Sequence, residues 1–238
     1  MKLKKINRGE ITTQQIVIMI ILITSFVVIL FFLFRLNFQD QTQKEICHNS
    51  VVLKGKSSTL SGGKLDCSTN YLCISSGKEC KLINPLETVK VSSKNESFKA
   101  IADEMANCWW QFGEGKIDYT GTIVGRSCAI CSVVEINASF NEKLTSRDFY
   151  DYLKKTKKDN SQTYFSYLYN LGYPTTVNDN NILNTDEKYY IVTGRSDSVK
   201  VPFIGIDIKD PSIVPVYFVN SSNLKTATGC TDFNIAKQ

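Results

Sequence analysis

Histidine is nearly absent from this chain, which narrows the chemistry that the protein can perform. The 238 residues include a single histidine, His48, next to Cys47. A Ser-His-Asp or Cys-His site would have to use that residue, so nucleophilic catalysis of these types is not expected. Gly121-Thr-Ile-Val-Gly125 lacks the Gly-Lys-Ser/Thr ending of a phosphate loop. We therefore predict no catalytic residues.

Outside the N-terminal tail, the chain has little net charge. The net charge is +5, and Lys2, Lys4, Lys5 and Arg8 supply much of it. The remainder is nearly balanced, which argues against nucleic acid as a partner. Short lysine clusters at 154–155 and 157–158 are typical of a solvated helix end.

Charge is missing altogether from Ile16 to Phe34, and this absence predicts a membrane span. A helix of about 20 apolar residues crosses the ~30 Å hydrocarbon core with its backbone satisfied. The positive-inside rule then makes residues 1–15 a cytoplasmic basic tail, 16–36 a transmembrane helix in membrane lipid, and the remainder extracytoplasmic. Arg35-Leu36-Asn37-Phe38 is not a small-residue cleavage site, so an uncleaved signal anchor is favoured over a removed signal peptide.

The start of the chain also carries a short leader-like pattern. Arg8-Gly9-Glu10 is followed by Ile11 to Gln15 and then by the apolar run. This pattern resembles an archaeal type IV pilin leader, which a peptidase cuts after glycine. The resemblance implies cleavage between Gly9 and Glu10 and an apolar helix that packs into a filament core. Glutamate stands where many archaeal pilins have glutamine.

Cysteine is absent from the predicted tail and membrane span, and all of it lies beyond them. The even number, eight, and this distribution predict a disulfide framework in an oxidising compartment. The candidates are Cys47, Cys67, Cys73, Cys80, Cys108, Cys128, Cys131 and Cys230. A structural zinc site is disfavoured because Cys128 and Cys131 have no second close pair. We expect no metal and no other cofactor.

The spacing Cys128-Ala-Ile-Cys131 allows two interpretations. As a redox-active pair it would make the protein an extracytoplasmic thiol oxidoreductase. The β-branched residues on both sides instead favour a strand through the motif. Residues three apart on a strand point to opposite faces, so each cysteine would then need a separate partner. Cys108 and Cys230 are the candidates.

The composition along the chain predicts several regions. Residues 37–46 form a polar stalk, 47–84 a cysteine-rich module with a hairpin clipped by Cys73 and Cys80, and 85–238 the main domain. Helical patterns occupy Ser97–Phe112, the segment after Thr145 and Ser161–Leu171. Strand patterns follow at Tyr189–Thr193, Val199–Ile208 and Ile213–Val219. The expected fold is α+β, with an antiparallel sheet and two or three helices.

Several residues are candidates for display or modification. Trp109 and Trp110 end the first helical pattern, where one core and one rim tryptophan are expected rather than a ligand platform. Glu114, between two glycines, could contribute to a ligand or partner surface, although a turn is the simpler interpretation. Asn-X-Ser/Thr triplets begin at Asn95, Asn137 and Asn220 and are candidate glycosylation sites.

One longer pattern covers roughly Cys47 to Glu135. Cys108-Trp-Trp-Gln-Phe-Gly-Glu-Gly-Lys116, followed by Cys128-Ala-Ile-Cys-Ser132, looks like a pattern in uncharacterised membrane-anchored proteins of small-genome archaea. The earlier strings Cys47-His-Asn-Ser-Val51 and Leu65-Asp-Cys-Ser-Thr69 also look similar to that family. This resemblance implies an architecture and no activity. Three hypotheses remain open: a cell-surface structural or interaction protein that contacts other cell-surface proteins, a pilin-like filament subunit, and a thiol oxidoreductase.

Overall fold

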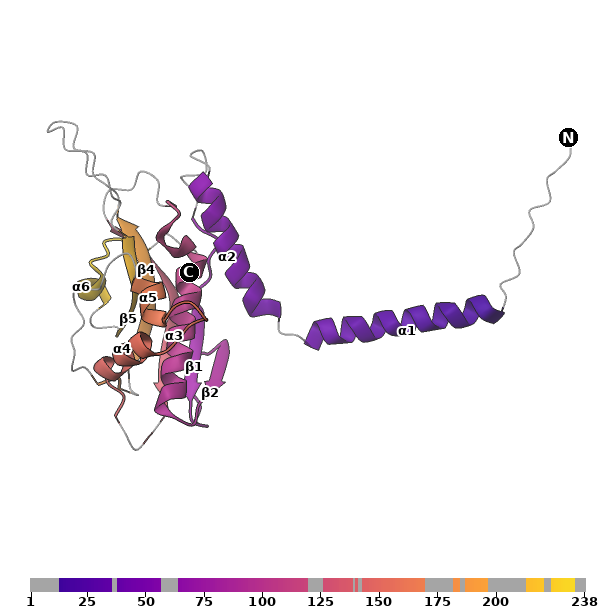
Figure 1. Ribbon diagram of the computed structural model, residues 1–238, viewed down its shortest axis with the longest axis horizontal. Coiled ribbons are helices and arrows are strands. Elements are labelled where there is room, and N and C mark those ends of the chain that lie inside the picture. The colour runs from indigo at the N-terminus through magenta and orange to yellow at the C-terminus, as the bar shows by residue number, and fades with distance from the viewer. Residues whose placement is uncertain are drawn as a thin grey trace, which may run out of the picture. The chain divides into compact units, whose positions relative to one another are not determined.

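A computed structural model of the full chain describes most of the residues (Figure 1). Described are residues 13–35, 38–56, 64–119, 126–138, 140, 143–169, 182–184, 187–196, 213–220 and 224–233. The chain divides into two compact units, Met1–Thr42 and Gln43–Gln238. The strand predicted at 199–208 and the leader residues Gly9 and Glu10 lie outside the described residues.

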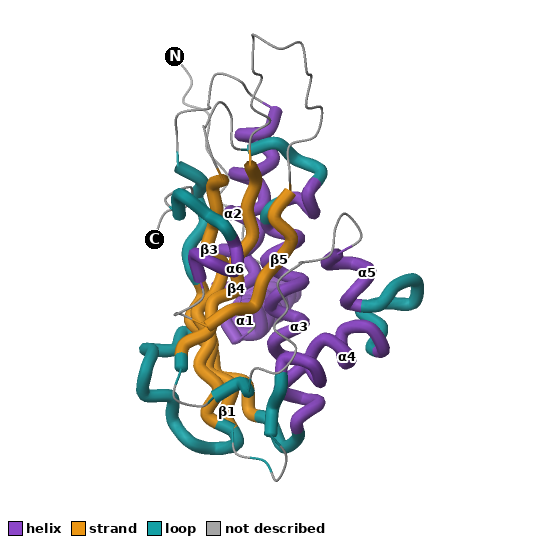
Figure 2. Tube along the Cα trace, turned by 90° about the vertical axis from the view of Figure 1, so that its left-hand side faces the viewer, coloured by secondary structure: helices purple, strands orange, loops and turns teal. Residues whose placement is uncertain are grey.

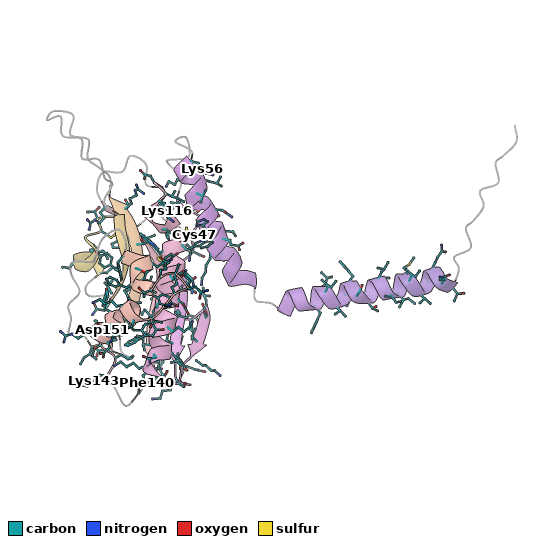
Figure 3. All side chains as sticks on the ribbon, in the orientation of Figure 1. Cys47, Lys56, Lys116, Phe140, Lys143 and Asp151 are labelled. Carbon is teal, nitrogen blue, oxygen red and sulfur yellow. A yellow bond between two sulfur atoms is a disulfide. The ribbon has the colours of Figure 1, made fainter. Side chains whose placement is uncertain are left out.

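The first unit contains helix α1, Thr13–Arg35. Figure 3 shows side chains projecting from both sides of this helix, and its large apolar residues from Ile16 to Ile29 are exposed, from 47% for Ile16 to 62% for Leu22. Residues Thr13–Phe31 have a mean hydropathy of 2.6, and none of that window is buried. A core helix would bury one apolar stripe. Helix α1 is therefore long and apolar enough to be a membrane anchor or a signal sequence.

The second unit is built on one five-stranded sheet. Its strands are β1 (Asn70–Ser75), β2 (Glu87–Lys90), β3 (Arg126–Asn137), β4 (Lys188–Ser196) and β5 (Ile213–Asn220), in the order β2-β1-β3-β4-β5. Helices α3 (Lys94–Gln111), α4 (Ser146–Lys155) and α5 (Tyr164–Tyr169) lie together on one side of the strands (Figure 2). Short α6, Leu224–Thr228, contributes Leu224 to a small cluster around Cys128 and Cys230.

The sheet is mixed, so the prediction of an antiparallel sheet is wrong in part. Strand β1 pairs in parallel with both β2 and β3, whereas β3 with β4 and β4 with β5 are antiparallel. Two connections return the chain to the same end of the sheet: residues 76–86 between β1 and β2, and a connection that contains α3 between β2 and β3, so these three strands run in the same direction. The α+β class itself is confirmed.

The main core lies between the sheet and α3. Helix α3 buries Phe98, Ile101 and Met105 at helical spacing, and they meet Leu72, Ile74 and other apolar side chains of the sheet. The helix begins at Ser93, whose side chain accepts a hydrogen bond from the Glu96 amide. The prediction of this helix is correct in position, although it starts earlier than Ser97.

The segment 47–84 does not form a module of its own. Its strand β1 lies between β2 and β3, inside the sheet, and belongs to the same compact unit as the rest. Cys73 on β1 is bonded to Cys80 in the loop that follows, so the disulfide closes a loop rather than a hairpin. Within the stalk predicted at 37–46, helix α2 (Phe38–Lys56) begins at Phe38, and it continues past Cys47.

Glu135 holds the loop after Cys80 against the sheet. This β3 residue is only 2% exposed, and its carboxylate accepts hydrogen bonds from three successive backbone amides. The distances are 2.8 Å from Lys81, 2.7 Å from Leu82 and 3.0 Å from Ile83. A buried carboxylate needs such donors because burial without them is strongly unfavourable.

Candidate functional site

From Lys44 to Gly55, helix α2 is fastened to the rest of the second unit, and we call this set of contacts the α2 junction. Cys47 is bonded to Cys67, and both Cys47 and Val51 are buried. Further along the helix, a Cβ on Gly55 would lie 2.3 Å from an Ile117 side-chain atom, so only glycine allows this approach (Figure 3 labels nearby Lys56 and Lys116). The helix that follows α1 is therefore part of the folded domain.

The aromatic contact of the α2 junction joins His48 to Trp110. Their rings stack with centroids 4.3 Å apart and planes 10° from parallel. His48 Nδ1 also lies 2.8 Å from the Trp110 carbonyl oxygen, at the C-terminal end of α3. Because a carbonyl only accepts, Nδ1 carries the proton and donates this bond. The one histidine of the chain thus has a structural partner.

The charged contact of the α2 junction joins Lys44 to Glu104. Their Nζ and Oε2 atoms are 3.2 Å apart, and the Glu104 side chain is only 6% exposed. Asn70 and Asn107 donate to the same carboxylate at 3.0 and 3.3 Å, and the Ser132 hydroxyl donates as well. Burial by itself raises the pKa of Glu104, but the Lys44 ammonium and these hydrogen bonds lower it below its ordinary value.

Sequence reasoning missed the role of Glu104 and did not single this residue out. The sequence indicates the burial of Glu104 but not its partners. Glu104 follows Ile101 by three residues and precedes Cys108 by four, which places it on the buried face of α3. Its partners come from α2, β1 and β3, and no local pattern indicates that these segments meet.

The three surface candidates do not form one surface. Trp109 is buried at 4% exposure, and Trp110 is 37% exposed with one ring face against His48, as expected for a core and a rim tryptophan. Glu114 instead accepts a hydrogen bond of 2.8 Å from Tyr167 on α5 and pairs with Lys116. The three side chains therefore contact different parts of the domain.

Glu114 has an unusual backbone conformation for its residue type. Its φ is 55°, between Gly113 at 75° and Gly115 at 73°, so three successive residues adopt left-handed values. A non-glycine residue pays about 1–2 kcal/mol for this conformation. Burial raises the pKa of Glu114, but the contacts with Lys116 and Tyr167 outweigh it and lower that pKa. The segment is a strained turn that fastens α5 to the end of α3.

A small cavity lies beneath this turn. Trp109, Phe112, Tyr119, Thr193 and Arg195 contribute to its lining. Arg195 is 8% exposed and donates from an Nη atom to the Ile117 carbonyl at 2.8 Å, while its Nε lies 3.6 Å from an Asp118 carboxylate oxygen. Nε has no hydrogen-bond partner in the part of the chain that the structure describes. Because that nitrogen is itself fully covered, the cavity does not present it to a ligand.

All eight cysteines are paired in the structure. Besides Cys47–Cys67 and Cys73–Cys80, the pairs are Cys108–Cys131 and Cys128–Cys230. Cys131 lies at a β-bulge and faces α3, whereas Cys128 faces the cluster around Cys230. Each cysteine of the Cys-X-X-Cys motif therefore has its own distant partner, which is the arrangement that the strand interpretation predicts.

Within the described ranges, no three or more His, Cys, Asp and Glu residues are grouped to hold a metal ion. The buried carboxylates Glu104 and Glu135 bind parts of the fold, and Glu114 fastens α5. What the arrangement provides is a disulfide-bonded domain that includes helix α2 from Gln43 onward. No family model, curated protein or solved structure matches this chain, so the fold and its contacts alone support a function.

Proposed function

We propose that the chain is a single-pass membrane protein that presents a disulfide-stapled domain at the cell surface for a structural or interaction role. Its N-terminus is cytoplasmic, and other cell-surface proteins are the partners. The observation that carries the proposal is that α2, which is bonded into the domain, follows the apolar helix α1 in the chain. A helix that is exposed and largely apolar ends at Arg35, and the helix that begins at Phe38 is bonded into the domain through Cys47.

The cysteines support the extracytoplasmic side of this proposal. Four disulfides can persist in an oxidising compartment, whereas cytosolic thiols are kept reduced. The pairing also gives the thiol oxidoreductase hypothesis no support. Cys128 and Cys131 are 0% and 6% exposed and belong to different disulfides, while a redox-active pair needs an accessible thiolate.

The α2 junction supports the proposal because it joins the chain that follows α1 to the domain. The disulfide, the Lys44–Glu104 pair and the His48–Trp110 stack hold α2 to the rest of the second unit. The chain beyond the apolar helix is therefore bonded into the domain from Lys44 onward.

Non-reducing peptide mapping of the mature, membrane-extracted protein tests the proposal. We expect an intact N-terminus, retention in the membrane after alkaline carbonate washing and the four disulfides described above. A terminus beginning at Glu10 would indicate the pilin-like alternative, and one beginning after α1 would indicate a cleaved signal and a secreted domain. Free thiols in a soluble chain would exclude a surface location.

A further inference from the structure

The three Asn-X-Ser/Thr triplets have different structural surroundings. Asn95 lies in the first turn of α3 and is exposed. Asn137 is the last residue of β3 and Asn220 the last residue of β5, and both are only half-exposed. A glycan attached to an asparagine needs space around the side-chain nitrogen, so these differences decide which triplets can carry one.

Asn137 and Asn220 use their side-chain nitrogens in the fold. Asn137 Nδ2 donates to the Glu79 carbonyl at 2.7 Å, which holds the loop that the Cys73–Cys80 disulfide closes. Asn220 Nδ2 donates to the Glu187 carboxylate at 3.0 Å, next to its pairing with Tyr189 across the sheet. A sugar on either nitrogen would replace one of its hydrogens within a half-buried contact and crowd the partner segment.

The surroundings of Asn95 contain no such contact. Its neighbours make the local bonds of the helix start: Ser93 caps the helix, Glu96 accepts from the Ser92 amide at 2.6 Å, and Lys94 pairs with Asp148 at 2.7 Å. Among the described residues, no hydrogen bond involves the Asn95 side chain. A sugar on Nδ2 would therefore project from the first turn of α3 and displace nothing.

We propose that Asn95 carries an N-linked glycan and that Asn137 and Asn220 do not. The inference rests on the proposed function, because the acceptor must cross the membrane to meet the glycosylation machinery. In the transfer, Asn95 Nδ2 forms a bond to the anomeric carbon of a lipid phosphate-linked sugar donor. The bond from that carbon to the phosphate oxygen breaks, the phosphate leaves with the electron pair, and the amide nitrogen loses one proton.

The timing of the transfer follows from Ser97. This residue supplies the hydroxyl of the triplet, yet it is 0% exposed in the folded protein, and its Oγ donates to the Ser93 carbonyl at 3.3 Å. The hydroxyl is accessible only before α3 forms, so the transfer takes place during export, when none of the three triplets is yet folded. The folded contacts then decide which modified chains reach the native structure: a sugar on Asn137 or Asn220 prevents the contacts of those side chains, whereas a sugar on Asn95 prevents none. The finished helix then tolerates it, because Asn95 itself points to solvent.

The test is mass spectrometry of the full chain, produced in a host that attaches N-glycans and compared before and after enzymatic deglycosylation. We expect one occupied site per chain, on the peptide containing Asn95, and loss of the mass shift in Asn95→Gln. Ser97→Ala keeps the asparagine and removes only the hydroxyl, so it should abolish the shift too. Both variants should retain the four disulfides, which shows that they fold.

The outcomes separate this inference from the proposed function. An unmodified Asn95 in a chain with four disulfides and a protease-accessible outer domain overturns the inference and leaves the function standing. Occupancy of Asn137 or Asn220 equal to that of Asn95 in the folded chain also overturns it. Free thiols and no glycan on any triplet would overturn both proposals together.

Discussion

The face of the sheet that α3 covers is filled by apolar side chains, whereas the opposite face is held by covalent and polar contacts. On the first face, Phe98, Ile101 and Met105 pack on alternate residues of the strands. The opposite face has only a small cluster around Cys128, Val192 and Cys230, and a loop held by Glu135. Each face has a disulfide that involves β3 and a buried carboxylate, Cys108–Cys131 with Glu104 on the α3 face and Cys128–Cys230 with Glu135 on the other. The comparison therefore teaches that the opposite face depends more on these contacts, because it lacks the apolar core that α3 provides.

The largest expected effect comes from removing one disulfide on each face. Cys128 and Cys230 are 102 residues apart, and loop-closure entropy predicts a loss of about 4.7 kcal/mol for replacing both by alanine. The matched control is Cys108 and Cys131, 23 residues apart, with an expected loss of about 3.4 kcal/mol. Denaturant unfolding of the full chain in detergent measures both, and a reversed order would break the comparison.

The substitution Glu135→Gln is expected to cause the next largest loss in the free energy of unfolding. The neutral side chain offers one acceptor oxygen to three backbone amides and turns an amide group toward them, which costs about 2–3 kcal/mol. Hydrogen exchange should accelerate at Lys81, Leu82 and Ile83. Glu79→Gln, on the exposed part of the same loop, is the control and should change neither quantity. Unchanged protection of those amides in the variant would show that the carboxylate does not hold the loop.

On the α3 face, Lys44→Met should lower the free energy of unfolding by about 1–3 kcal/mol, because it leaves the Glu104 carboxylate buried without its cation. Lys90→Met, on the exposed edge strand β2, should have no effect. A difference between these two variants of less than the error of the measurement would contradict the assignment.

The same pair predicts a pH dependence. The pKa of Glu104 is lowered in the folded protein, so its ionisation stabilises the fold above the ordinary carboxyl value of 4.5 and is lost as the pH falls through the lower, folded value. Glu104→Gln should therefore lose less stability than the wild type in this acidic range. If the free energy of unfolding fell equally with pH in Glu104→Gln and the wild type below pH 4.5, the result would argue against an ionised Glu104.

The smallest effect is expected at the aromatic contact of the α2 junction. His48→Ala removes the stack on Trp110 and should cost about 0.5–1.5 kcal/mol. Because Trp110 then becomes more exposed, its fluorescence should shift to longer wavelength. Asn49→Ala changes the neighbouring, exposed position of α2 and serves as the control. An unchanged emission spectrum in the first variant would mean that the ring does not cover Trp110.

The same contrast explains how much the sequence could reveal. Periodicity identified α3 and the strands around 189–193 and 213–219, and Thr145 does cap α4 as its spacing indicates. The contacts on the opposite face leave no repeating pattern in the sequence, because Glu135, Cys80 and Cys230 lie on segments that meet only in the folded chain. The mixed sheet was missed for the same reason: β1 was assigned to a separate module, although it lies inside the sheet between β2 and β3.

The central claim is an anchored domain on the outer side of a membrane, and protease treatment of intact cells tests it most directly. With a tag placed before Met1, the account predicts that added protease removes the disulfide-bonded domain and leaves a membrane-embedded fragment that carries the tag and α1. Full protection of the chain in intact cells, with digestion only after the membrane is opened, would contradict the account.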